Sequence, residues 1–133
     1  MRPIGYLSGS ELATLLEQPD AASAVRVVDV RDSDFEGGHI RGATHIPAHQ
    51  FLANAGAYAT RWRGEQRVVF HCMLSQVRGP KCATRFAVAL DDGGDGGGPD
   101  VFVLDGGFSG FATTPARRAL CEDLDARMWG GGA

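Results

Sequence analysis

Residues 67–80 read Arg-Val-Val-Phe-His-Cys-Met-Leu-Ser-Gln-Val-Arg-Gly-Pro. The apolar run over residues 67–70 predicts the central strand of a sheet. A helix is predicted from about Gly79 to Leu90, because apolar side chains recur there at helical spacing. These apolar positions are Ala83, Phe86, Ala87 and Leu90. We therefore expect Cys72 at the carboxyl edge of the sheet, which is where α/β folds bind their ligands.

The loop between this strand and this helix has the residues of an oxyanion site. Cys72 and Arg78 are separated by five residues. If the loop is concave, its backbone N–H groups point inward and, together with the N-terminus of the helix, form a nest that binds anions. The predicted oxyanion-binding residues are Met73, Leu74, Ser75, Gln76, Val77 and Arg78.

Cys72 is the predicted nucleophile of this site. The guanidinium of Arg78 offers a planar fork of donors to two oxygens of a tetrahedral oxyanion. The same positive field is expected to keep the sulfur of Cys72 ionised at neutral pH. We expect His71 to shape the loop by hydrogen bonding to backbone. The alternative is a structural cysteine beside a surface arginine, because free cysteines are often buried and inert.

The composition is that of an ordinary globular domain, with 133 residues, of which 44% are hydrophobic and 22% charged. We predict one catalytic domain over residues 1–128 and a disordered tail over 129–133.

The formal net charge of −3, without a basic block, argues against a nucleic-acid or membrane partner. No segment is long and apolar enough to span a membrane. Three widely spaced cysteines, with no signal-peptide pattern, indicate a reducing, cytoplasmic location.

The rest of the chain alternates between predicted strands and helices. Strands are predicted at residues 4–7, 25–30, 43–46 and 101–104. Helices are predicted after the capping box Ser8-x-x-Glu11, over residues 48–60, and from Pro115 to about Arg127. Residues 35–40 are predicted to form a turn with a short helix, residues 106–110 a turn, and the glycine-rich residues 91–100 a flexible surface loop. This alternation predicts an α/β fold with a central, mostly parallel sheet of about five strands and helices on both faces.

Several motifs resemble the rhodanese-like domain, from about residue 4 to about residue 112. They are Val28-Asp-Val-Arg-Asp32, Phe35-Glu-Gly-Gly-His-Ile-Arg-Gly-Ala43, Ile46-Pro47 and Val103-Leu-Asp-Gly-Gly-Phe108. The active loop is one residue wider than in sulfur-transferring rhodaneses, and it is similar to that of the cell-cycle phosphatases of this fold and the eukaryotic arsenate reductases related to them. The run from Leu74 to Pro80, followed by Cys82-Ala83, looks most like the plant and algal arsenate reductases.

The resemblance implies an arsenate reductase. It implies Cys72 as nucleophile, Arg78 as oxyanion ligand, and Asp29 and Arg31 as residues that hold the loop. Glutathione is implied as co-substrate and glutaredoxin as the partner that completes the reduction, with no bound cofactor. The alternative is a protein tyrosine or dual-specificity phosphatase acting through a cysteinyl-phosphate. Sulfur transfer from thiosulfate and a non-enzymatic anion-binding module are further alternatives.

One departure from the phosphatases favours arsenate. Their loop carries glutamates where this chain has Met73 and Val77, so the loop contains no acid. Hydrolysis of a phosphoester needs a proton on its leaving alkoxide. Attack on arsenate releases hydroxide or water, which is a less demanding leaving group than the alkoxide of a phosphoester. An acid from the substrate or from a distant loop would still permit hydrolysis.

The remaining cysteines and histidines are given structural roles. Cys82 could resolve an adduct of Cys72 as a disulfide, but a helix pointing away from the loop would keep the two thiols apart. Structural roles are therefore favoured for Cys82 and Cys121, and the resolving thiol is expected from outside. Glu36 and His39 match motifs that are mainly structural. No metal is expected, because the histidines lack a zinc-like spacing with any cysteine; these histidines are His39, His45 and His49.

Overall fold

The computed structural model describes residues 2–18, 20, 24–93 and 96–125 of the chain. A five-stranded sheet with the order β1-β6-β5-β2-β4 forms its centre, and every neighbouring pair of strands is parallel. The strands are β1 (Ile4–Leu7), β2 (Arg26–Asp29), β4 (Thr44–His45), β5 (Arg67–His71) and β6 (Asp100–Leu104). The predicted α/β class and parallel sheet are confirmed. The predicted tail over 129–133 lies outside the described residues.

β5 is the central strand because its side chains are apolar on both faces. Val68, Val69 and Phe70 are fully buried, as is typical of a parallel strand covered by helices on both sides. The register of β5 with β2 places Asp29 beside His71. This pairing brings the end of β2 next to the start of the Cys72 loop, so strand register assembles the edge on which the site lies.

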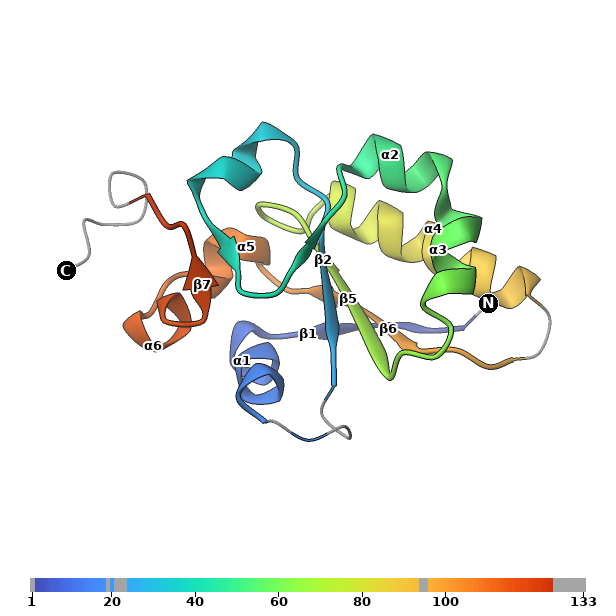
Figure 1. The fold of residues 1–133 in the computed structure, drawn as a ribbon, viewed down its shortest axis with the longest axis horizontal. Coiled ribbons are helices and arrows are strands. Elements are labelled where there is room, and N and C mark those ends of the chain that lie inside the picture. The colour runs from blue at the N-terminus through green and yellow to red at the C-terminus, as the bar shows by residue number, and fades with distance from the viewer. Residues whose placement is uncertain (1, 19, 21–23, 94–95, 126–133) are drawn as a thin grey trace.

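Helices cover both faces of the sheet (Figure 1). On one face lie α2 (Ala48–Ala53), α3 (Ala55–Arg61) and α4 (Arg78–Asp92), and on the other lie α1 (Gly9–Glu17) and α5 (Gly107–Phe111). The predicted single helix over residues 48–60 is two helices. They are separated at Asn54, whose backbone has φ −130° and whose N–H donates to the carbonyl of Phe51. The predicted capping box of α1 is confirmed, since Ser8 and Glu11 each accept a hydrogen bond from the other's backbone.

The core under α2, α3 and α4 is an aromatic cluster. Phe51 packs against Phe70 with ring centroids 5.0 Å apart, and Phe86 packs 5.3 Å from Phe70. Trp62 completes the cluster at 5.9 Å from Phe86. Because Phe86 belongs to α4, the helix that follows the loop is anchored to the same strand that precedes it.

The C-terminal region differs from the prediction. The helix expected from Pro115 to about Arg127 is a single turn, α6 (Pro115–Arg118), and the chain then forms a strand, β7 (Cys121–Glu122). β7 pairs antiparallel with β3 (His39–Ile40), and the N–H of Arg41 donates to the carbonyl of Leu120 at 2.8 Å. Pairing with a distant segment therefore ends the helix, and helical spacing within residues 115–127 does not reveal it.

Both predicted turns contain a short helix, which the sequence predicts for residues 35–40 but not for residues 106–110. Residues 106–110 overlap α5, which begins after Gly106 in a left-handed conformation with φ +79°. The turn over residues 35–40 overlaps a 3-10 helix, η2 (Ser33–Gly37). α5 is about one turn long, which is too short for periodicity in the sequence to identify. Among the described residues, every helix is too short or too polar to cross a membrane.

Replacing Phe86 by alanine should test how strongly α4 is anchored. Phe86→Ala removes a fully buried ring from the aromatic cluster, and the free energy of unfolding should fall by about 3–5 kcal/mol. The control is Arg85→Ala, an exposed neighbour on the same helix, which should change it by less than about 0.5 kcal/mol. Urea unfolding followed by circular dichroism measures both. Equal values for the two variants would contradict this packing.

Candidate active site

The loop from Cys72 to Arg78 encloses a cavity at the carboxyl edge of the sheet. β5 ends at His71 and α4 begins at Arg78, so the loop lies between the central strand and its helix. The cavity has a volume of about 210 Å³, and its lining is Cys72, Met73, Leu74, Gln76, Val77 and Arg78. Cys72 is 3% exposed, and its Sγ accepts a hydrogen bond from the N–H of Gly79 at 3.4 Å. The sulfur thus lies against the first turn of α4, the positive end of the helix dipole.

Hydrogen bonds to α5 orient the backbone of the loop. The carbonyl of Cys72 accepts from the N–H of Phe108 at 3.0 Å, and the carbonyl of Met73 accepts from the N–H of Ser109 at 2.9 Å. In a trans peptide the C=O and the following N–H point in opposite directions, and none of the described peptide bonds is cis. The N–H groups of Met73 and Leu74 therefore point away from α5. No α5 residue lines the cavity, so these donors face the side on which the cavity lies.

Gly107 allows α5 to approach the loop this closely. Its φ is +61°, and a Cβ at this position would lie 2.5 Å from the carbonyl oxygen of Met73 and 2.6 Å from that of Cys72. A side chain would therefore clash with both carbonyls and would also strain the backbone. Gly79 has a related role at the start of α4, where a Cβ would lie 3.3 Å from the Cα of His71.

Asp29 and Arg31 form a buried ion pair beneath the loop. Both side chains are fully buried, and Arg31 Nη2 lies 2.6 Å from Asp29 Oδ2. Arg31 also donates to the carbonyl of Gly38 at 2.7 Å, and its guanidinium lies 4.3 Å from the ring centroid of Phe108. Burial alone would raise the pKa of the Asp29 carboxyl, but the charge that His71 carries when it is protonated, the charge of Arg31 and the hydrogen bonds from Arg31 hold this pKa below its ordinary value. The pair thus connects the end of β2 to η2 and α5.

His71 hydrogen-bonds to backbone, as the sequence predicted. Its Nδ1 lies 3.2 Å from the carbonyl of Cys72, and Nδ1 must be the donor because a carbonyl oxygen only accepts. Its Nε2 lies 3.8 Å from Asp29 Oδ2 and makes no hydrogen bond with the described residues. Burial lowers the pKa of His71 although the nearby Asp29 carboxylate opposes this. His71 is therefore neutral at pH 7 and supports the loop rather than supplying a charge.

Arg78 lies at the rim of the cavity, next to an acid that the sequence prediction did not include. The Arg78 side chain is 32% exposed, and its Nη1 is 3.9 Å from Oδ2 of Asp32. Asp32 follows β2, and its Oδ1 lies 3.8 Å from Nδ1 of His49 in α2. The side chain of His49 is 82% exposed, so this histidine lies on the surface. The position of Asp32 directly after β2, at the carboxyl edge, is the signal that could have identified it.

Ser75 belongs to the loop but is not among the residues that line the cavity. It is 6% exposed, with a left-handed backbone at φ +55°. Its hydroxyl is buried and makes no hydrogen bond with any residue that the structure describes. Met73, Leu74, Gln76 and Val77, by contrast, form part of the wall of the cavity.

The other two cysteines have thiols of low acidity. Cys82 is fully buried, and burial followed by the nearby Cys72 raises its pKa to about 12. Burial raises the pKa of Cys121 to about 11. Both therefore stay protonated at neutral pH, and a protonated thiol is a poor nucleophile. No group of three or more His, Cys, Asp or Glu residues within the described part of the chain could hold a metal ion.

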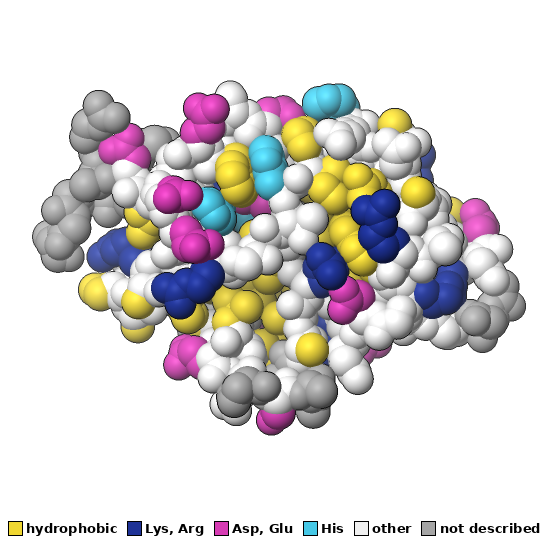
Figure 2. All heavy atoms as spheres, in the orientation of Figure 1, with side chains coloured by type: hydrophobic (Ala, Val, Ile, Leu, Met, Phe, Trp, Pro, Cys, Tyr) yellow, Lys and Arg dark blue, Asp and Glu magenta, His cyan; other side chains and the backbone are white. Residues whose placement is uncertain are grey.

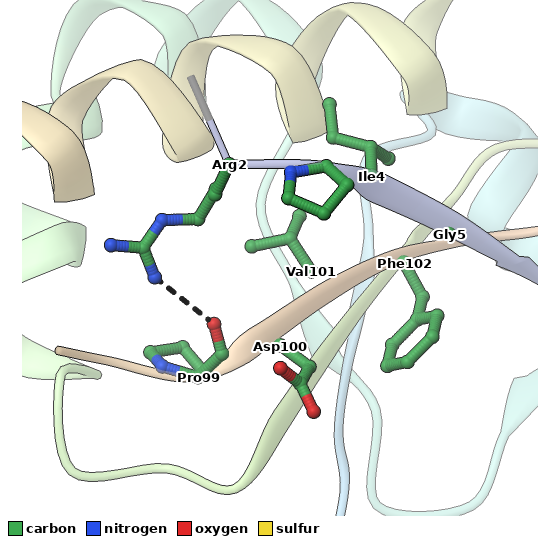
Figure 3. Close-up of a pocket in the computed structure, with 8 residues that line it drawn as sticks. Arg2, Ile4, Gly5, Pro99, Asp100, Val101 and Phe102 are labelled. Carbon is green, nitrogen blue, oxygen red and sulfur yellow. Dashed lines mark hydrogen bonds between the residues drawn. The ribbon is translucent and has the colours of Figure 1, made fainter. Parts of the chain in front are cut away.

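A second cavity lies at the opposite edge of the sheet (Figure 3). Its volume is about 250 Å³, and it lies between the amino ends of β1 and β6. Arg2 closes it by donating to the carbonyl of Pro99 at 3.4 Å and to the carboxylate of Asp91 at 2.9 Å. None of the predicted site residues lines it. Figure 2 shows basic and acidic side chains interspersed over one face of the molecule, without a large area of a single sign.

Comparisons with known proteins match this geometry to one family. The family model described as "Rhodanese-like domain" matches residues 8–114. Arsenate reductase 2.2 of Oryza sativa subsp. japonica is 33% identical over 128 residues, which cover 95% of each chain. Dual specificity phosphatase Cdc25 of Arabidopsis thaliana is 31% identical over 128 residues, covering 95% of this chain and 85% of that protein. The solved As-Sb reductase from Leishmania major superposes with a TM-score of 0.75 and 35% identity, over 82% of this chain and 77% of that chain.

Gly107→Ala should disrupt the loop. The added Cβ would push against the carbonyls of Cys72 and Met73, so we expect a loss of about 1–3 kcal/mol of stability and a clear loss of affinity for inorganic phosphate as a test oxyanion. The control is Gly110→Ala in the same helix, where a Cβ would meet its nearest atom at 3.9 Å. Thermal unfolding and titration calorimetry measure the two effects. Phosphate affinity that is equal in both variants would show that α5 does not orient the loop.

His71 should make stability depend on pH below about 6.5. Because its pKa is lower in the folded state than in the unfolded chain, the unfolded chain takes up the proton first as pH falls. Stability is complete above about pH 6.5 and decreases below it by up to about 1.4 kcal/mol per pH unit. His71→Asn keeps an N–H donor but cannot titrate, so its unfolding free energy should change less over this range. Urea unfolding at pH 7.0, 6.0 and 5.5 compares the two slopes, and parallel slopes would contradict a neutral, buried His71.

Proposed function

This chain belongs to the family of rhodanese-like domains, and from that premise we propose that it is an arsenate reductase with Cys72 as the nucleophile. The observation that carries the proposal is the loop itself. Its carbonyls at Cys72 and Met73 are bonded to α5, so amide donors face a cavity that contains the sulfur and Arg78. Such a hollow suits a tetrahedral oxyanion, and the lining contains no acid for phosphoester hydrolysis.

The proposed reaction begins with attack of the Cys72 thiolate on arsenic. The amides of the loop and the fork of Arg78 hold the arsenate oxygens, and the first turn of α4 faces the sulfur. One oxygen leaves as water, which gives an arsenic(V) adduct on sulfur. Glutathione then attacks the adduct, and formation of a disulfide transfers two electrons to arsenic and releases arsenite. Glutaredoxin reduces the disulfide and returns the thiol of Cys72.

The resolving thiol is proposed to come from outside the protein. Cys82 is fully buried, and its thiol stays protonated because burial raises its pKa to about 12. Glutathione and glutaredoxin supply a thiol without this burial. A reducing cytoplasm fits this chemistry because it keeps Cys72 as a free thiol.

A phosphatase acting through a cysteinyl-phosphate is the second candidate. The observation that favours it is Asp32, whose carboxylate lies 3.9 Å from the guanidinium of Arg78 at the rim of the cavity. An acid there is placed to protonate a leaving alkoxide, although the loop itself offers none. One preparation assayed with p-nitrophenyl phosphate and with arsenate plus glutathione and glutaredoxin separates the two functions. Turnover of the phosphoester alone would replace the first proposal by the second.

Three variants test the roles of the site residues. Cys72→Ser should abolish arsenate reduction, because the hydroxyl neither ionises at neutral pH nor forms a reducible bond to arsenic. Arg78→Lys should retain only a small fraction of the wild-type kcat/KM, since an ammonium lacks the two-point fork. Cys82→Ala is the matched control and should keep most of the activity. Steady-state arsenite formation measures all three. Full activity of the Cys72 variant, or complete loss in the Cys82 variant, would contradict the mechanism.

A further inference from the structure

A stripe of exposed side chains runs from the active loop along α4. Its members are Val77, Lys81, Arg85 and Val88, all of which are exposed. Val77 precedes α4 and the other three belong to the helix. Their spacing of four, four and three residues places side chains on one face of a helix. The opposite face, with Cys82, Ala83 and Phe86, is buried against the sheet. We call the exposed set the α4 stripe.

Apolar exposure in the described residues is concentrated at this stripe and at the cavity it adjoins. The large apolar side chains with high exposure are Tyr6, Leu74, Val77 and Val88, and three of them lie in the loop or on α4. Leu74 is 52% exposed and Val77 70% exposed. An oxyanion has no apolar surface, so substrate binding does not account for these side chains. Apolar groups grouped around a cavity are typical of a surface that contacts another molecule.

The stripe is also basic. Lys81 and Arg85 lie between Val77 and Val88, and neither forms an ion pair with a residue that the structure describes. Acidic side chains on an approaching protein could therefore pair with them. Such complementary charges mainly increase the rate of association and define its orientation. The surface is thus complementary to a partner that is apolar at its centre and acidic at its edge.

Because Cys72 is buried, a thiol carried by another protein must approach it across this surface. The sulfur is 3% exposed and lies in a cavity whose wall includes Leu74 and Val77. A thiol carried by a protein reaches this sulfur only if the surface around that thiol contacts the wall. Val77 belongs both to the wall and to the α4 stripe, so a protein docked there would have its thiol next to the cavity.

We propose that the α4 stripe, together with Leu74, is the docking surface for an acidic thiol protein that reduces the mixed disulfide formed between Cys72 and glutathione. This inference rests on the proposed function, because it assigns the place where the external reductant of that reaction binds. It adds that recognition depends on Lys81 and Arg85, which lie outside the cavity.

The test uses a reaction that does not need arsenate. Cys72 is first converted to a mixed disulfide with thionitrobenzoate. The Cys121→Ser substitution removes the half-exposed cysteine, and Cys82 is fully buried, so the label is directed to Cys72. A thiolate attacks this disulfide, the S–S bond exchanges, and thionitrobenzoate is released with a change in absorbance. The probes are a dithiol glutaredoxin with acidic residues around its reactive cysteine and, separately, dithiothreitol. The ratio of the two rate constants reports docking, because dithiothreitol needs only the open cavity.

Two charge reversals are compared with a matched control. Lys81→Glu and Arg85→Glu each change the net charge by the same amount as Arg61→Glu, which alters an exposed arginine at the end of α3. We expect each stripe variant to lower the ratio of glutaredoxin to dithiothreitol rates by about threefold to tenfold. The wild-type glutaredoxin rate should fall with added salt, and this dependence should be weaker in the stripe variants. Arg61→Glu should leave the ratio unchanged.

Each outcome bears on the proposal separately from the arsenate assay. Ratios in the stripe variants equal to that of Arg61→Glu would overturn the docking surface, even if the protein reduces arsenate. A lowered ratio in a protein that does not reduce arsenate would support the docking surface and contradict the proposed function. The stripe variants could instead keep the wild-type ratio of glutaredoxin to dithiothreitol rates and lose activity only toward a phosphorylated protein. That result would show that this surface binds a protein substrate and not a thiol partner.

Discussion

The active loop depends on two hydrogen bonds between its carbonyls and the first turn of α5. These bonds hold the carbonyls of Cys72 and Met73 toward α5, and the planarity of the peptide then directs the following amides toward the cavity. A loop without this constraint could turn its carbonyls toward the cavity and repel an anion. Gly107 is required at the contact because a Cβ would lie 2.5 Å from a loop carbonyl. The loop that carries Cys72 is thus held in place by α5, which follows it in sequence after α4 and β6.

Beneath the loop, a buried ion pair supports this arrangement. Buried charges are costly unless they are paired and hydrogen-bonded, and breaking such a pair by removing one partner commonly costs about 3–5 kcal/mol. Asp29 and Arg31 meet this requirement, since the guanidinium bonds both the carboxylate and the carbonyl of Gly38. His71 lies next to this pair and bonds the carbonyl of Cys72. The network therefore joins the ends of β2 and β5 to the loop that they support.

Arsenate and phosphate have the same charge and shape, so the groups around the hollow decide between reduction and hydrolysis. The cavity lining contains no acid, which favours a leaving group that departs as water. Asp32 at the rim is the one feature described here that favours hydrolysis. Cys82 shares the core with Cys72 but stays protonated because burial raises its pKa to about 12, so the reductant is expected from outside. The exposed face of α4 is the surface at which we propose that this reductant binds.

Local patterns in the sequence were sufficient for the strands of the central sheet, the capping box at Ser8 and the order strand, Cys72 loop and helix. Each of these depends on side chains that are neighbours along the chain, whose spacing directly reflects which face is buried. Asp29 and Arg31 were assigned to the support of the loop by resemblance to a family. In the structure, the β2–β5 register pairs Asp29 with His71, and Arg31 forms an ion pair with Asp29.

Only the tertiary structure decided three features. The segment after Arg118 forms a strand because His39 and Ile40 offer it a partner, the approach of α5 makes Gly107 essential to the loop, and the fold brings Asp32 to Arg78. In each case the residues that interact are far apart in sequence. Their relation is set by how separate elements pack, so it leaves no periodic signal within either segment.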